Sequence, residues 1–182
     1  ALPILAIGTR ADCVDEEKVR MIDDFGRQTF VSLEFGVESI YDDTLKRVNR
    51  GHNYAAFLQA MKLTRGTSLH TGAHLILGFP WETRDQWIAM ADEMSRIGVD
   101  LVKIHHLHIV RETALAAEYA RSPFPTLGYE EYLDVLCEFV ERLDHRIVIE
   151  RMFGEAPRGL LVAPNWNRTK NDLVIDINRI FE

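Results

Sequence analysis

The stretches that decide the fold are His74-Leu-Ile-Leu-Gly-Phe-Pro-Trp-Glu-Thr83 and Val102-Lys-Ile-His-His-Leu-His-Ile-Val110. Each begins as a short apolar run rich in β-branched residues and then gives way to loop or polar residues, which is the pattern of a buried strand that leads into a loop. Similar runs occur near residues 3–8, 30–36 and 146–150. Because a helical pattern follows every run except the last, the sequence predicts βα units around a parallel sheet, an α/β fold.

Apolar residues with helical spacing fill the segments between these runs. They recur around residues 54–61, 87–97 and 132–143, and a last helix is expected from Lys170 to Phe181. The expected helix ends are marked by two capping-box spacings, Thr83 with Gln86 and Ser39 with Asp42, and by two stop signals, Gly66 and Gly98. These helices should cover the sheet.

The composition fits one compact domain that spans residues 1–182, with a C-terminal extension from about residue 146. The chain has 182 residues, of which 47% are hydrophobic, and a net charge of -7. That charge makes it a poor partner for a nucleic-acid backbone or an anionic membrane. Cys13 and Cys137 form no Cys-x-x-Cys pair, which argues against a disulfide framework and favours a reducing, cytoplasmic compartment.

Four polar segments should meet at one edge of the sheet, because parallel strands end on the same side and ligands bind there. These segments are residues 8–10, 36–39, 78–83 and 105–108. A carboxylate such as Glu38 suits a ribose diol or an ammonium, and the guanidinium of Arg50 suits a carboxylate or phosphate. The alternative is that Glu38 and Arg50 lie on an ordinary solvated surface.

A metal centre is a second interpretation of the polar side chains at this edge. The candidate ligands are His74, His105, His106 and His108, together with Glu38. No partner motif such as His-Glu-x-x-His accompanies them, so we favour histidines that hydrogen-bond to backbone or to a polar ligand. By strand alternation, His106 and His108 should share one face of the strand and His105 the other.

Two other functions stay open on the residues alone. A barrel lyase or aldolase would use a buried lysine at a strand end, and Lys103 is the strand lysine that the sequence offers. A non-catalytic α/β binding module would use the same edge of the sheet without chemistry.

The order of five segments resembles the radical S-adenosylmethionine superfamily, and within it the YhcC-like branch related to the Elongator catalytic subunit and to oxygen-independent coproporphyrinogen oxidase. These segments are residues 8–13, 33–39, 44–52, 74–83 and 102–110, and the resemblance continues through residues 151–158 and 163–164. The resemblance implies the later strands of a partial TIM-type (βα)6 barrel with a C-terminal helical extension.

The resemblance also implies the chemistry of an iron–sulfur oxidoreductase. A [4Fe-4S] cluster, held by three cysteines, takes an electron from an external donor and cleaves S-adenosylmethionine to a 5′-deoxyadenosyl radical, which abstracts hydrogen from the substrate. The substrate is unknown, a small molecule or tRNA. This chain lacks the cysteine motif. We therefore expect a fragment that begins after the cluster-bearing units, is inactive alone and binds S-adenosylmethionine weakly or not at all.

The resemblance assigns cofactor-binding roles but no catalytic residue and no metal ligand in this chain. Glu38 faces the ribose or methionine part, Arg50 the methionine carboxylate, Gly78 the adenine, and His106 and His108 the border of adenine and substrate, while Arg10 belongs to the characteristic Gly-Thr-Arg segment. Two positions depart from the branch: Ala11 stands where Pro is usual, and Trp81 stands where Gly is common, which would narrow the rim.

A fragment of this kind would leave residues 3–7 at a sheet edge with unpaired amides and apolar side chains. We expect no membrane partner, and we hypothesise self-association through this edge.

Overall fold

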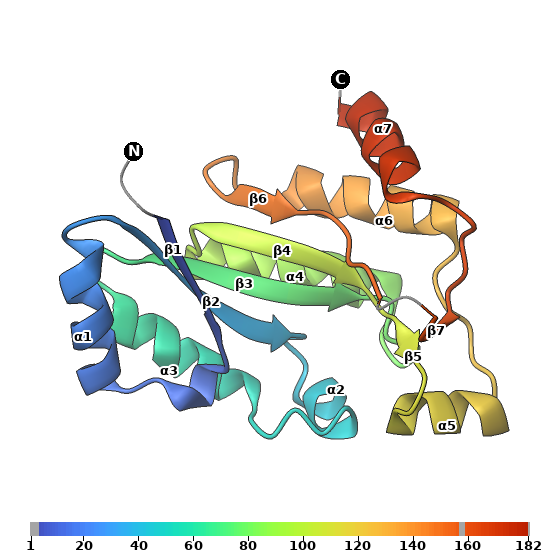
Figure 1. Ribbon diagram of the computed structural model, residues 1–182, viewed down its shortest axis with the longest axis horizontal. Coiled ribbons are helices and arrows are strands. Elements are labelled where there is room, and N and C mark those ends of the chain that lie inside the picture. The colour runs from blue at the N-terminus through green and yellow to red at the C-terminus, as the bar shows by residue number, and fades with distance from the viewer. Residues whose placement is uncertain (1–3, 157–158, 182) are drawn as a thin grey trace.

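The computed structural model describes residues 4–156 and 159–181 and contains a five-stranded parallel sheet (Figure 1). The strands lie in the order β1 (Ile4–Thr9), β2 (Phe30–Glu38), β3 (His70–Leu77), β4 (Leu101–His106) and β6 (Val148–Arg151). The predicted α/β fold with a parallel sheet of βα units is confirmed. Residue Pro3 of the expected edge strand lies outside the described residues.

The helices between the strands pack on one face of the sheet (Figure 1). They are α1 (Glu16–Gly26), α3 (Tyr54–Thr64), α4 (Arg84–Ile97) and α6 (Tyr129–Arg142). The parallel strands of the sheet pair in chain order, and crossovers of the same hand place these four helices on the same side. The order does not reverse as it does in a doubly wound sheet, so it matches one wall of a βα barrel. The six-unit barrel itself stays a prediction.

The alternation of side chains along β2 distinguishes the face of the sheet that the helices cover from the opposite face. Val31, Leu33 and Phe35 are fully buried toward the helices, and the Phe35 ring meets Phe57 of α3 edge-on at 5.8 Å. Glu34, between them, points to the opposite face. Burial of each large apolar side chain contributes about 1.5–3 kcal/mol. The packing of β2 on α3 thus leaves the other face of the sheet for polar groups.

Shorter elements surround this unit. They are η1 (Ala11–Cys13), α2 (Asp42–Arg47), α5 (Ala114–Arg121), the antiparallel pair β5 (Ile109–Val110) and β7 (Leu161–Ala163), and α7 (Lys170–Phe181). The expected terminal helix is confirmed, and the Trp166 indole, which donates to the Leu127 carbonyl at 2.9 Å, ties the segment before it to the loop ahead of α6. Within residues 4–156 and 159–181, no helix combines the length and apolar content needed to cross a bilayer.

Three of the four predicted helix-end signals are confirmed. Thr83 and Gln86 form the reciprocal capping box of α4, and Gly98 ends this helix in the left-handed conformation. Gly66 follows the end of α3 with a φ of 77°. The capping box predicted for Ser39 is wrong: Tyr41 occupies the N-cap of α2 without a side-chain bond, because the buried Ser39 hydroxyl donates to a carboxylate of another loop.

Candidate functional site

The carboxyl ends of the first four strands meet along one edge of the sheet. The helices α2 and α5 lie beyond this edge (Figure 1). In parallel α/β folds, ligands bind at this edge, because the loops that follow the strands converge there.

Arg50, in the loop between α2 and α3, reaches back to the end of β2. Its Nε and Nη2 donate to the Gly36 carbonyl at 3.1 and 2.6 Å, and Nη2 lies 3.4 Å from Oε1 of Glu38. The two charged side chains keep 21% and 24% of their surface exposed. A Cβ at position 36 would collide with the guanidinium, so glycine allows Arg50 to lie against the strand. The structure therefore brings Glu38 and Arg50 together.

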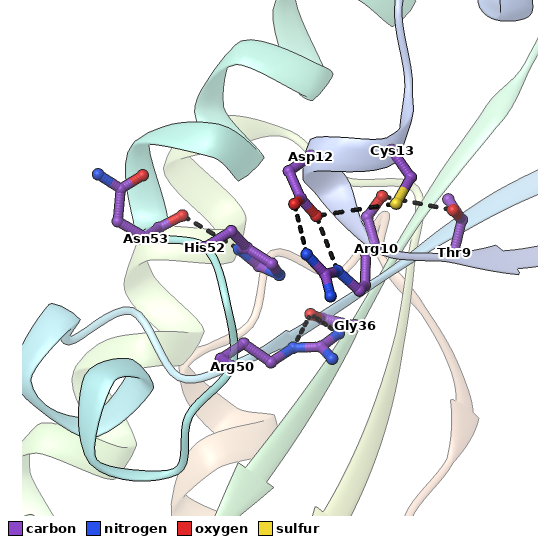
Figure 2. A network of polar contacts seen from close by, with 8 residues as sticks. All are labelled: Thr9, Arg10, Asp12, Cys13, Gly36, Arg50, His52 and Asn53. Carbon is purple, nitrogen blue, oxygen red and sulfur yellow. Dashed lines mark hydrogen bonds and ion pairs between the residues drawn. The ribbon is translucent and has the colours of Figure 1, made fainter.

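Arg10 joins this cluster from the end of β1. Its Nε and Nη2 donate to the two carboxylate oxygens of Asp12 at 2.9 and 2.5 Å, which lowers the pKa of Asp12 to about 2. The guanidinium of Arg10 also lies against Gly51, where a Cβ would come within 3.3 Å of Nη2. Figure 2 shows the guanidinium groups of Arg10 and Arg50 on either side of the Gly36 carbonyl. Each guanidinium lies beside a carboxylate, so an anionic ligand group would meet hydrogen-bond donors whose charge is already paired.

The pKa of the Glu38 carboxyl group depends on burial and on the charged groups around it. Burial raises its pKa, and the nearby Arg50, His74 and His52 act in the opposite direction. A ligand ammonium placed at this carboxylate would further favour its ionised form.

A second polar cluster lies deeper on the same face of the sheet. Glu34, only 2% exposed, accepts hydrogen bonds from Ser32 Oγ at 3.0 Å, from His74 Nε2 at 2.7 Å and from Lys103 Nζ. Lys103 also lies 3.0 Å from Glu150. Burial alone would raise the pKa of Glu34, but the bonds from Lys103, His74 and Ser32 outweigh it and lower the pKa. These residues link β2, β3, β4 and β6 below the rim.

The histidines of β4 alternate between the two faces. His105 lies with His74 on the face of the sheet opposite the helices, and their rings lie 6.3 Å apart. His106 points toward the helices, where its ring stacks on Trp166 at 3.9 Å and its Nε2 lies 2.6 Å from Nε2 of His108. His106 and His108 therefore lie on the opposite face from Glu38. Among residues 4–156 and 159–181, no group of three metal-binding side chains is arranged to hold an ion.

A cavity of about 340 Å³ opens beside Glu38, within the usual size range of small-molecule pockets. Most of its wall is apolar and comes from Ile76, Phe79, Trp81, Leu107 and Leu115. Trp81 lies at the rim, as its departure from the branch pattern suggested, with the Arg47 guanidinium 4.1 Å from its ring centroid. Gly78, with a φ of 95°, packs toward Leu127, where a Cβ would come within 2.7 Å.

Sequence reasoning did not single out Leu107, Ile76 or Glu82. Leu107 lies between the two predicted histidines and faces the cavity in their place. Strand alternation could have identified Ile76, two residues beyond His74. Nothing in the sequence marks the buried Glu82 as a partner of Ser39, because that contact joins two loops.

Comparison with protein families decides the assignment. The model of the Radical SAM superfamily matches residues 2–94, and the model of the Radical SAM C-terminal domain matches residues 99–180. The chain belongs to the radical SAM superfamily. Its relatives place this radical SAM chain in the YhcC-like branch: protein YhcC of Escherichia coli strain K12 is 29% identical over 176 residues, which are 96% of this chain and 57% of YhcC.

A second relative is the tRNA uridine(34) acetyltransferase of Methanocaldococcus infernus. It is 28% identical over 161 residues, which are 87% of this radical SAM chain and 30% of the acetyltransferase. The chain spans about half the length of the first curated relatives that it matches, 51 to 57%.

Among solved structures, Elp3 of Methanocaldococcus infernus with an N-terminal deletion (1–46) superposes with a TM-score of 0.81 at 24% identity. The match covers 97% of this chain and 41% of Elp3. At this identity the likeness shows a shared radical SAM fold.

Proposed function

We propose that this chain forms the S-adenosylmethionine-binding wall of a radical SAM oxidoreductase. The observation that carries the proposal is the Glu38–Arg50 pair, a carboxylate and a guanidinium 3.4 Å apart at the carboxyl end of β2. Arg50 would bind the methionine carboxylate, because two of its nitrogen atoms meet Gly36 and a guanidinium has five donors to share. Glu38 would accept hydrogen bonds from the ribose diol or the ammonium group.

The cavity beside Glu38 suits the adenine. Its apolar wall offers Ile76 and Leu107 to the faces of a planar base, next to the turn at Gly78. Leu107 thus takes the bordering role that the resemblance implies for His106 and His108, and these two histidines would support the strand end from behind. Arg10, paired with Asp12, would add hydrogen-bond donors beside Arg50.

The residues of this chain do not fit the iron–sulfur cluster that the superfamily uses. A [4Fe-4S] cluster needs three thiolates, whereas the two cysteines lie far apart in the fold, Cys13 in η1 and Cys137 on α6. We therefore assign no step on this chain to the cluster. When reductively cleaved, S-adenosylmethionine supplies a 5′-deoxyadenosyl radical for hydrogen abstraction. The residues here would bind and orient it and exclude water from it.

A Schiff-base aldolase is disfavoured by the state of Lys103. Such an enzyme needs a lysine with a lowered pKa. Burial alone would lower the pKa of Lys103, but hydrogen bonds to Glu34 and Glu150 outweigh it and raise the pKa. The alternative is a module that binds a ligand without catalysing a reaction, and the experiment distinguishes it from a radical SAM enzyme.

The experiment uses the complete reading frame that encodes this chain. Iron and sulfide are reconstituted anaerobically, dithionite stands in for the external electron donor, and 5′-deoxyadenosine released from S-adenosylmethionine is quantified. We expect release that falls at least about 100-fold in Glu38→Ala and in Arg50→Ala, because both remove contacts to the cofactor.

A matched control is Arg84→Ala, which removes a guanidinium paired with Glu138 on the helix side of the sheet. It should leave release unchanged. A protein with a verified cluster but no release would support the binding module and contradict the proposal.

For the substrate, we keep two classes. The name of the related tRNA uridine(34) acetyltransferase supports tRNA. Binding of tRNA to the complete protein, with an affinity that falls steeply as salt rises, would assign that class. Absence of such binding would assign a small molecule.

A further inference from the structure

The backbone that carries Glu38 is strained. Glu38 has a φ of 65°, in the left-handed region that non-glycine residues rarely adopt. The Ser39 amide donates to the Val37 carbonyl at 2.8 Å, so Glu38 is the central residue of a three-residue turn. The pairing of β2 with β3 also shifts between Gly36 and Glu38. A turn of this kind persists only where its surroundings hold it.

Contacts on both sides of Glu38 hold this turn. Before it, Arg50 fixes the Gly36 carbonyl. After it, the Ser39 hydroxyl donates to Oε1 of Glu82 at 2.6 Å and accepts from the Tyr41 amide at 3.1 Å. Ser39 is fully buried.

Glu82 comes from the loop between β3 and α4 and is 7% exposed. Its Oε1 also accepts from the Thr44 hydroxyl at 2.5 Å. Burial raises the pKa of Glu82, while hydrogen bonds from Ser39 and Thr44 act against the rise. In the described part of the chain, the contacts made by this carboxylate are to neutral donors. A carboxyl group buried without a cation stabilises a fold poorly, so its place here calls for another reason.

We propose that Glu82 is a positioning residue of the candidate site, which acts through Ser39 to hold the turn that aims Glu38 at Arg50. This positioning role rests on the proposed function only in the identity of the ligand, S-adenosylmethionine. Glu82 lies outside the set of ligand-facing side chains, and its influence on a ligand passes through the backbone of residues 37–39.

Two substitutions separate positioning from general stability. Ser39→Ala removes the hydroxyl that anchors the turn. Thr44→Val removes the other hydroxyl on the same Glu82 oxygen, and with it the acceptor of the Trp81 indole, but no bond to residues 37–39. Amide hydrogen exchange at position 39 and the NMR titration of the Glu38 carboxyl are measured on the whole chain without ligand. In Ser39→Ala we expect exchange to rise about tenfold or more and the pKa of Glu38 to fall toward its ordinary value, because the carboxyl becomes solvated.

Thr44→Val should change neither the amide exchange at position 39 nor the pKa of Glu38. Equal changes in the two variants, or no change in Ser39→Ala, would overturn the proposal. Glu82→Gln keeps an acceptor oxygen and should resemble the unsubstituted chain, whereas Glu82→Ala should resemble Ser39→Ala. Where Glu82→Ala fails to fold, the serine and threonine variants decide.

A third reading separates this proposal from the proposed function. The complete protein is titrated calorimetrically with S-adenosylhomocysteine, and Ser39→Ala is expected to weaken binding about tenfold relative to the unsubstituted protein. No binding by any form, together with the expected changes at position 39 and Glu38, would contradict the proposed function and leave the positioning role supported. An affinity of Ser39→Ala equal to that of the unsubstituted protein would contradict positioning.

Discussion

His106 is a histidine that the fold keeps neutral. It is 5% exposed and packs against Trp166 and Tyr132, and burial lowers its pKa to about 2. The unfolded chain gains a proton here below about pH 6.5, whereas the folded chain does not until far lower pH. Acid therefore favours the unfolded state, and stability should be lost as pH falls through this window.

We predict that His106→Phe weakens the acid dependence of folding. Phenylalanine keeps the aromatic packing but takes up no proton in either state. Between about pH 6 and pH 5, the free energy of unfolding should fall less steeply in the variant, by about 1 kcal/mol per pH unit. Urea unfolding at several pH values measures this slope.

His145→Phe is the control for that measurement, since the His145 side chain is 93% exposed in the folded chain. It should leave the slope unchanged. A slope in His106→Phe equal to that of the unsubstituted chain would contradict the burial argument.

The same residue shows a limit of sequence reading. Alternation correctly paired His106 with His108 and separated both from His105. Alternation did not predict which of the two faces contacts the helices. A parallel strand that is covered on both sides is apolar along its whole length, so its sequence does not distinguish the faces. The faces were decided by Tyr132 and Trp166, far along the chain.

At the scale of elements, the ion cluster around Glu34 joins four strands. Lys103 of β4 contacts Glu34 of β2 and Glu150 of β6, and its side chain is 11% exposed. A buried pair of this kind contributes little net stability when intact, but loss of one partner leaves an uncompensated charge.

We predict that Lys103→Met lowers the free energy of unfolding by about 3–5 kcal/mol, because Glu34 stays buried without its cation. Combining it with Glu34→Gln should restore part of the loss. Denaturant unfolding of the single and double variants measures both effects.

Arg84→Met serves as the comparison, since Arg84 and Glu138 form a pair with 44% and 45% of their side chains exposed. Removing that pair should cost no more than about 1 kcal/mol. Equal losses at positions 84 and 103 would show that the Glu34 cluster is no different from a surface pair.

Elements of ordinary length were predictable from the sequence, and short ones were not. The five strands of the sheet and the helices α3, α4, α6 and α7 carry enough apolar residues to show a period. By contrast, β5, β7 and α2 span two, three and six residues, which is too few for a period to emerge. Their positions depend on contacts made after the sheet has formed.

For the whole molecule, the strand order explains how the site is assembled. Since β1, β2, β3 and β4 are parallel and pair in chain order, the loops that follow them converge at one edge. The sequence predicted that convergence, and the family resemblance implied that Glu38 and Arg50 face the same cofactor. The sequence could not predict the three-residue turn at Glu38 or its anchor on Glu82, because that anchor joins residues 43 positions apart.

One outer edge of the five-stranded sheet is formed by β1. In the described chain, β1 pairs with β2 on one side, and Ile4 and Leu5 are 75% and 40% exposed. An unpaired strand edge with apolar side chains is a template for another strand. We therefore predict that the 182-residue chain self-associates through β1, with a sedimentation coefficient that rises with concentration.

Ile4→Lys should weaken this association about tenfold or more, because a lysine on an edge strand opposes pairing with a second edge. Met21→Lys is the matched control: Met21 is 58% exposed on α1, so it adds the same charge away from the strand edge. Self-association that persists in Met21→Lys and is lost in Ile4→Lys would place the contact at β1. A chain that sediments as a monomer at every concentration would contradict the prediction, and equal weakening in both variants would assign the effect to net charge instead of to strand pairing.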